Sequence, residues 1–168
     1  IEAEKDPHIL IMSSDHQILN PNKFVETIEQ GINYSEKGRL VTFGVIPNKP
    51  ETGYGYIKAE KTFSKEDSNG SKILEFTEKP DIETAKSFLK DKRYTWNSGM
   101  FMFKTSSILN EIKQYSPDIY KYCKQSINQS NRDLDFHRLS FDTFSKCPNL
   151  SIDLAIMEKT SNGVVLPL

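Results

Sequence analysis

The chain has 168 residues, of which 36% are hydrophobic and 27% are charged, and its 22 basic and 23 acidic residues give a formal net charge of −1. This length suits a single globular domain, and the balanced charge offers no extended positive surface to a nucleic acid. No apolar run approaches the roughly 20 residues of a membrane-spanning helix, so we expect no membrane partner.

The first element that the sequence predicts is a short buried strand over residues 8–12, where Ile9, Leu10, Ile11 and Met12 follow one another. It ends in Ser13, Ser14 and Asp15, and open α/β sheets bind their ligands at such carboxyl ends of strands. A helix should follow, because Asn20 can cap it and Pro21 suits its first turn. Its predicted apolar face consists of Phe24, Val25, Ile28 and Ile32.

The middle of the chain alternates strand and helix signals. Residues 40–46 predict a second buried strand, residues 56–63 another strand, residues 64–71 a solvated hairpin tip, and residues 72–77 an alternating strand. Asp81 should then cap a helix with an apolar face of Ile82, Ala85 and Leu89.

Residues 96–103 are almost entirely apolar from Met100 onward, which favours a strand buried on both faces. Just before it, Asn97, Ser98 and Gly99 can present polar atoms and exposed backbone to a ligand; a plain turn is the alternative. Thr105 should open a helix that turns Ile108, Leu109 and Ile112 inward.

Residues 116–148 are polar with a mostly helical pattern, and we expect a helical insertion there. Ser151 should cap a last helix with Ile152, Ala155 and Ile156 on one side. The alternation of strands and helices along the chain predicts an α/β sandwich.

The two cysteines, Cys123 and Cys147, are too few for a disulfide scaffold and lack metal-ligand spacing. We therefore expect reduced thiols in a cytoplasmic protein. The chain starts at Ile1 rather than at a methionine, and its last residues, 164–168, read as an unfinished strand. These ends predict an excised piece of a longer protein.

Three further polar groups could carry chemistry. Asp15 could ligate Mg²⁺, or it could be a turn or cap residue. Gly53 and Gly55 in Gly-Tyr-Gly-Tyr56 could let a ligand approach the backbone, or they could form a hairpin turn. Glu78 and Lys79 could bind ligand hydroxyls and a phosphate, or they could form a surface ion pair. Together with Asn97 and Ser98, these clusters fit a polyhydroxylated, phosphorylated ligand.

Several motifs resemble those of one known family. They are Ile-Pro at residues 46–47 with Pro-Glu-Thr-Gly-Tyr-Gly-Tyr-Ile at 50–57, Phe-Thr-Glu-Lys-Pro at 76–80, Trp-Asn-Ser-Gly-Met-Phe at 96–101, and Ser-Ile-Asp with Ala-Ile-Met-Glu-Lys at 151–159. In order and approximate spacing the chain resembles the bacterial mannose-1-phosphate guanylyltransferases, over nearly its whole length. Asp15 matches that family's metal-binding aspartate, although Ser13 and Ser14 replace the proline and alanine that usually precede it.

The resemblance implies a Rossmann-like nucleotidyltransferase fold with a mixed, mostly parallel sheet truncated at both ends. Residues 1–168 would be one partial domain with the helical insertion at about 116–148. The implied reaction converts GTP and mannose 1-phosphate to GDP-mannose and pyrophosphate. Asp15 would hold Mg²⁺, the backbone around Gly55 would face the sugar, Glu78 and Asn97 would bind its hydroxyls, and Lys79 would meet its phosphate. A homo-oligomer is left open.

The same resemblance identifies motifs that this sequence does not contain. The glycine-rich G-x-G-T-R loop that holds the GTP phosphates would precede Ile1, and a second metal-binding aspartate would follow Leu168. We therefore expect the 168-residue chain to be catalytically inactive by itself. A glucose-1-phosphate nucleotidyltransferase and a non-catalytic sugar-phosphate-binding module are the alternative functions.

Overall fold

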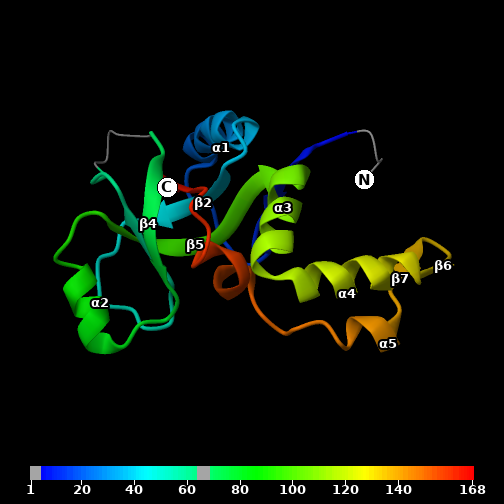
Figure 1. Ribbon diagram of the computed structural model, residues 1–168. Helices are drawn as coiled ribbons and strands as arrows, with labels where there is room; N and C mark the ends of the chain where they lie inside the picture. The colour runs from blue at the N-terminus through cyan, green and yellow to red at the C-terminus, as the bar shows by residue number, and fades with distance from the viewer. Residues whose placement is uncertain (1–4, 64–68) are drawn as a thin grey trace. The chain divides into compact units, whose positions relative to one another are not determined.

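The computed structural model describes residues 5–63 and 69–168 (Figure 1). The chain forms two compact units, a sheet unit within residues 1–108 and 160–168, and a helical unit of residues 109–159. Most of the hairpin tip predicted over residues 64–71 lies outside the described residues. In the described ranges, no helix combines the length and the apolar character needed to cross a membrane.

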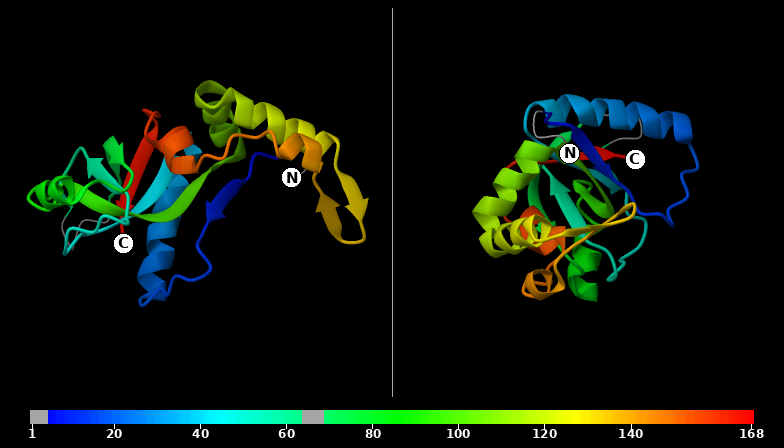
Figure 2. Two further views of the ribbon diagram at one scale, coloured as in Figure 1. Left: turned by 90° about the horizontal axis from the view of Figure 1, so that it is seen from below. Right: turned by 90° about the vertical axis from the view of Figure 1, so that its right-hand side faces the viewer.

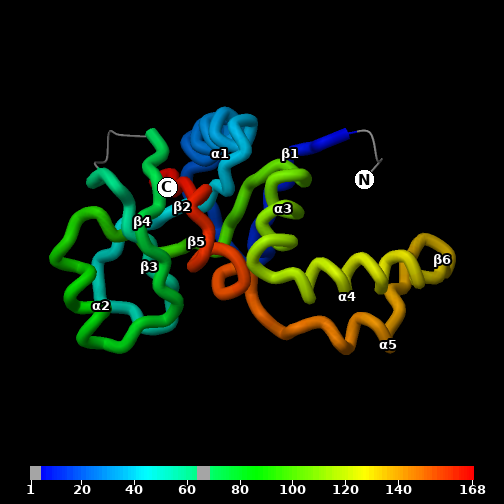
Figure 3. Tube along the Cα trace, viewed as in Figure 1, coloured from blue at the N-terminus to red at the C-terminus, as the bar shows by residue number. Residues whose placement is uncertain are grey.

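The sheet unit is built on one six-stranded sheet with the order β1-β5-β2-β8-β4-β3. Its strands are β1 (His8–Ile11), β2 (Leu40–Val45), β3 (Tyr56–Ala59), β4 (Ser71–Thr77), β5 (Tyr94–Lys104) and β8 (Gly163–Pro167). β3 also pairs with β5, so β5, β2, β8, β4 and β3 close into a ring of hydrogen-bonded neighbours. β1 is left as an edge strand, and Figure 3 labels both β1 and β3.

The sheet is mixed, as the sequence predicted, but it is not mostly parallel. Among the described pairings only β2 with β8 is parallel, and the other pairings in this sheet are antiparallel. The reason is the central strand β5, which runs antiparallel to each of its three neighbours, β1, β2 and β3.

β5 is the buried strand that the sequence predicted, since residues 100–103 are at most 3% exposed. It is longer than predicted, however, and residues 97–99 lie inside it rather than before it. Thr42 of β2 faces Phe101 and Gly44 faces Asn97, so two steps along β2 match four steps along β5. The extra residues form a β-bulge, a device that re-aims side chains within a strand.

The helix α1 (Pro21–Glu36) begins as predicted, with the Lys23 N–H donating to the Asn20 side chain at 3.1 Å and Pro21 in the first turn. Its inward face agrees with the prediction in part: Phe24 and Ile28 pack against the core, whereas Val25 and Ile32 are exposed. The fully buried positions are Thr27, Gly31 and Ser35. Small residues on this face let the helix approach the sheet closely, and a Cβ on Gly31 would lie 3.1 Å from the Met102 sulfur. α1 packs along β2, β5 and β8 (Figure 2).

β1 is half-exposed rather than buried, because β5 is its only strand partner in the described sheet. Ile11 and the following Met12 are each 44% exposed. The strand is fastened by His8, whose Nδ1 is hydrogen-bonded to Ser35 Oγ at 2.8 Å and whose Nε2 lies 2.7 Å from Glu36 Oε1. Glu36 also pairs with Lys104 Nζ at 2.8 Å, so one carboxylate ties α1 to β1 and β5.

The short helix α2 (Ile82–Phe88) starts at the predicted cap, where the Thr84 N–H donates to Asp81 at 2.8 Å. Its inward side chains are Ala85 and Phe88, and the predicted Ile82 is 44% exposed. Phe88 stacks on Tyr94 with ring centroids 4.1 Å apart. These residues belong to a core cluster that consists of Tyr56, Ala85, Phe88, Tyr94 and Trp96.

The helix α3 (Thr105–Tyr115) starts in the sheet unit and continues into the helical unit. The helical unit then holds α4 (Pro117–Asn128), the hairpin of β6 (Asn131–Asp133) and β7 (Phe136–Arg138), α5 (Phe141–Phe144) and η1 (Asp153–Met157). The hairpin was not predicted, and η1 is a single π-helical turn rather than the α-helix expected after Ser151. Ala155 and Ile156 are nevertheless buried, as predicted.

The close packing at Gly44 gives a stability prediction. A Cβ there would lie 2.4 Å from Thr95 Oγ1 and 2.8 Å from Val165 Cγ2, whereas a Cβ on Gly53 would meet nothing within 4 Å. We expect Gly44→Ala to lower the free energy of unfolding by about 1–3 kcal/mol through overpacking. Gly53→Ala should leave it unchanged. Urea denaturation measures both, and an equal effect of the two substitutions would contradict this packing.

Candidate functional site

The pairing of β3 with both β4 and β5 brings three of the predicted residues together. Tyr56 of β3 is paired with Thr77 of β4 on one side and with Trp96 of β5 on the other. Both pairings are antiparallel. The residue before Tyr56, Gly55, therefore lies between Glu78, which follows Thr77, and Asn97, which follows Trp96. The Asn97 N–H donates to the Gly55 carbonyl at 2.8 Å. A Cβ on Gly55 would stand 2.6 Å from Glu78 Oε2 and 3.4 Å from Asn97 Cβ. Only glycine allows the Glu78 carboxylate this position.

The Asn97 amide is oriented by bonds within the β5 bulge. Its Oδ1 accepts from the Thr42 hydroxyl at 3.0 Å and from the Gly99 N–H at 3.2 Å. These two bonds to the oxygen fix the orientation of the Asn97 amide, which carries hydrogen-bond donors on its nitrogen. Asn97 is half-buried, so a ligand can reach it from solvent.

Ser98 and Gly99 complete the bulge. The Met100 N–H donates to Ser98 Oγ at 3.3 Å, and Gly99 has a φ of 73°, which glycine adopts without strain. A Cβ on Gly99 would lie 3.9 Å from Ser13 Oγ. The loop after β1 therefore reaches the bulge, and Asp15 stands exposed in a turn of that loop, two residues beyond Ser13.

Lys79 has an unusual backbone for its residue type. Its φ is 46°, in the left-handed region that non-glycine residues seldom occupy. The side chain is 64% exposed, and its Nζ lies 3.6 Å from Glu78 Oε1. Because the lysine end of this ion pair is exposed, the pair contributes little to stability. Backbone strain of this kind clusters at ligand-binding sites.

Gly53 and Tyr56 lie differently from the other predicted residues. Gly53 is exposed and its missing side chain would meet no atom, so its local packing does not require glycine. The Tyr56 ring is fully buried against Phe88, with centroids 5.3 Å apart. Its hydroxyl is buried without a hydrogen-bond partner among the described residues. The Tyr56 side chain thus belongs to the core.

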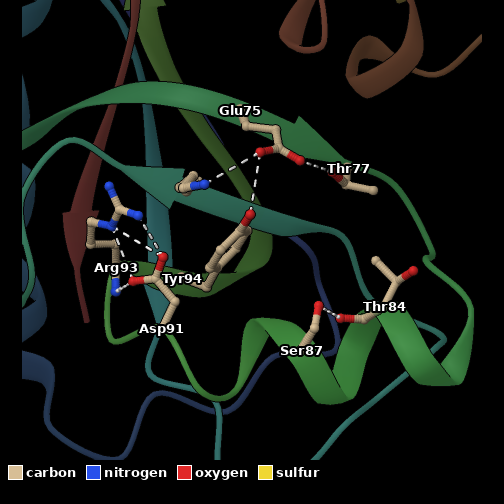
Figure 4. Close-up of polar contacts among 8 residues, drawn as sticks. Glu75, Thr77, Thr84, Ser87, Asp91, Arg93 and Tyr94 are labelled. Carbon is tan, nitrogen blue, oxygen red and sulfur yellow. Dashed lines mark hydrogen bonds and ion pairs between the residues drawn. The ribbon is translucent and has the colours of Figure 1, made fainter.

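A polar cluster supports the strands that carry the site (Figure 4). The Arg93 guanidinium donates to both oxygens of Asp91, at 3.0 and 2.7 Å, and these bonds lower the pKa of Asp91 to about 2. The Tyr94 hydroxyl donates to Glu75 at 3.2 Å. Burial, followed by the nearby Glu75 carboxylate, raises the pKa of Tyr94 to about 12. The Tyr94–Glu75 bond joins β5 to β4, whereas the Asp91–Arg93 pair lies in the turn just before β5.

Two residues of the site had not been singled out in the sequence. Thr42 is a fully buried hydroxyl in an otherwise apolar strand, and it holds Asn97 in place. Ser13 had been noted among the polar residues that end the first strand, and as a substitution before Asp15, but it had been given no role. A polar residue inside an apolar strand is a signal that could have identified Thr42, because buried hydroxyls need hydrogen-bond partners.

The described part of the chain contains no group of three or more His, Cys, Asp or Glu side chains able to enclose a metal ion. Asp15 presents a single exposed carboxylate. That donor set suits Mg²⁺, which is commonly held by one or two protein carboxylates with the remaining positions filled by phosphate oxygens and water.

Comparison with known proteins gives the family. The sequence pattern described as nucleotidyl transferase matches residues 1–143. The chain belongs to the nucleotidyl transferase family. It is 44% identical over 163 residues to a mannose-1-phosphate guanylyltransferase of Salmonella typhimurium, covering 97% of this chain and 33% of that protein. It is 40% identical over 166 residues to one of Escherichia coli K12, covering 98% and 35%. The chain thus spans about a third of the length of these curated relatives.

Two solved structures share the fold of this nucleotidyl transferase chain. A Helicobacter pylori protein described as mannose-6-phosphate isomerase superposes with a TM-score of 0.87 at 30% identity, covering 99% of this chain and 63% of that one. A Thermus thermophilus protein described as mannose-1-phosphate geranyltransferase gives 0.77 at 24% identity, covering 95% and 44%. The predicted Rossmann-like α/β class is therefore confirmed.

The raised pKa of Tyr94 gives a pH prediction. The unfolded phenol ionises near its ordinary value of 10.0 and the folded one only near 12, so the stabilisation is present below pH 10 and is lost as the pH rises toward 12. We expect the stability difference between wild type and Tyr94→Phe to shrink over that interval. Urea unfolding at several alkaline pH values measures it, and a constant difference would contradict the assignment.

Proposed function

We propose that this chain provides the sugar-phosphate half-site of a mannose-1-phosphate guanylyltransferase, which makes GDP-mannose and pyrophosphate from GTP and mannose 1-phosphate. The observation that carries the proposal is the convergence of Gly55, Glu78 and Asn97 on adjacent strands. The guanylyltransferase names of relatives 40–45% identical to nearly the whole chain support it.

Each proposed role follows from the chemistry of the group. The Glu78 carboxylate accepts hydrogen bonds from sugar hydroxyls, and the Asn97 amide nitrogen donates to a sugar oxygen. The exposed Lys79 ammonium meets the phosphate as a point charge. The backbone at Gly55, with no side chain in the way, faces the sugar ring. Ser98 belongs to the site through its place in the bulge.

The reaction requires little general-base catalysis from these residues. The phosphate of mannose 1-phosphate is already an anionic nucleophile, so catalysis consists of aligning it with the α-phosphorus of GTP and neutralising charge. Asp15 would hold Mg²⁺, which when bound supplies positive charge to the nucleotide phosphates. We further propose a cytoplasmic location, with which the free thiols Cys123 and Cys147 agree.

A binding experiment on the 168-residue chain tests the sugar half-site. We expect mannose 1-phosphate to shift backbone amides near Gly55, Lys79 and Asn97 in NMR spectra, and Lys79→Met to raise the Kd about tenfold or more by removing a charge-assisted contact. Lys86→Met is the matched control, since the Lys86 ammonium pairs with Glu83 on the surface of α2 and its removal should not change the Kd.

The glycine pair provides a sharper steric test. In Gly55→Ala the added methyl group presses on the Glu78 carboxylate, so we expect the Kd for mannose 1-phosphate to rise several-fold. In Gly53→Ala the methyl group enters open space, and the Kd should not change. Equal Kd values for the two variants would remove Glu78 from the site. Tighter binding of glucose 1-phosphate would favour a glucose-1-phosphate nucleotidyltransferase instead.

The 168-residue chain should bind without turning over. Incubated with GTP, mannose 1-phosphate and Mg²⁺, it should yield no GDP-mannose above a control lacking protein, because it contains no G-x-G-T-R loop. Chromatographic detection of GDP-mannose in this assay would contradict the expectation. Binding of mannose 1-phosphate by the longer parent protein without any synthesis would favour a non-catalytic module.

A further inference from the structure

The helical unit brings together the only two cysteines of the chain. Cys123 lies on α4 and Cys147 follows α5, twenty-four positions apart, yet their sulfur atoms are 3.9 Å from each other. Both residues are free and half-buried. The sequence had given no reason to pair them, because the contact depends on how α4 and α5 pack.

The two thiols continue an ordered contact between α4 and α5. The Ser126 hydroxyl donates to the Ser140 carbonyl at 3.2 Å, and the Ser140 N–H donates to the Ser126 carbonyl at 3.3 Å. One turn further along, Thr143 is hydrogen-bonded to Gln129. Cys123 is one helical turn before Ser126 on α4, and Cys147 is four residues after Thr143, so these bonds hold the two segments together close to both sulfurs.

We propose that Cys123 and Cys147 are a site of reversible oxidation, at which a small disulfide such as oxidised glutathione converts the two thiols into an intramolecular disulfide. A disulfide requires sulfurs about 2.05 Å apart, so the pair must close by roughly 2 Å. Cys147 lies beyond the last residue of α5, beside the exposed Pro148. The segment can therefore shift without unwinding a helix.

The oxidation balances in two exchange steps. The Cys123 thiolate attacks one sulfur of oxidised glutathione, forming a mixed disulfide and releasing one glutathione thiolate, which takes up a proton. The Cys147 thiolate then attacks the Cys123 sulfur and releases the second glutathione. Burial raises the pKa of the Cys147 thiol and so lowers its thiolate fraction, which leaves the first attack on glutathione to Cys123. Two thiols are oxidised and one glutathione disulfide is reduced.

Mass spectrometry of the intact 168-residue chain tests the product. After incubation with oxidised glutathione and alkylation with N-ethylmaleimide, the wild type should carry neither adduct and should weigh about 2 Da less than the reduced chain. Cys123→Ser and Cys147→Ser each retain one thiol and should stop at a single glutathione adduct. A wild type that carries two glutathiones, or that forms disulfide-linked dimers, would overturn the proposal.

A second measurement tests whether the fold brings the two thiols together, or whether they meet only because they are close in sequence. The ratio of oxidised to reduced chain in a series of glutathione buffers gives the effective concentration of the thiol pair. We expect it to be at least tenfold higher in buffer than in concentrated guanidinium chloride, where α4 and α5 are absent. An equal or lower value in buffer would show that the fold does not favour the disulfide, and would overturn the proposal.

Discussion

The hydroxyl of Thr42 fixes the local geometry from which the site is built. It is fully buried, and it lies within hydrogen-bond distance of Asn97 Oδ1 at 3.0 Å and of the Met100 carbonyl at 3.1 Å. It therefore bridges the residues on either side of the β5 bulge. At this bulge β5 changes its partner from β3 to β1. The loops that carry Gly55 and Ser13 reach the same place because β3 begins there and β1 ends there.

The candidate site combines a part that is fixed by backbone pairing with charged side chains that are accessible to solvent. Gly55, Asn97 and Gly99 are set by strand pairing and by bonds inside the bulge. Two of the charged groups, Asp15 and Lys79, reach into solvent, whereas Glu78 is half-buried. Groups that are held in place before a ligand arrives lose little entropy on binding, and exposed charged side chains can adjust to it.

Local signals in the sequence were sufficient for some elements and insufficient for others. The caps at Asn20 and Asp81 could be predicted because each bonds to a residue three positions away. The buried face of α1 could be predicted only in part: Phe24 and Ile28 pack on the core, whereas the small residues Thr27, Gly31 and Ser35 carry no hydrophobic signal for their burial. The exposure of Ile11 and the contact of Cys123 with Cys147 depend on partners distant in sequence. At the site, the motifs indicated Gly55, Glu78 and Asn97, but only the register showed that they meet around Gly55.

The parallel pairing of β2 with β8 has a consequence for synthesis on the ribosome. It aligns Leu40 with Gly163, so the whole helical unit is translated between the two partner strands. At a translation rate of about 5–20 residues per second, roughly 6–25 s pass between the synthesis of β2 and that of β8. During that wait one edge of a strongly apolar strand has no partner, and such edges promote aggregation. Vectorial synthesis therefore exposes the nascent chain to a hazard that refolding of the complete polypeptide does not share.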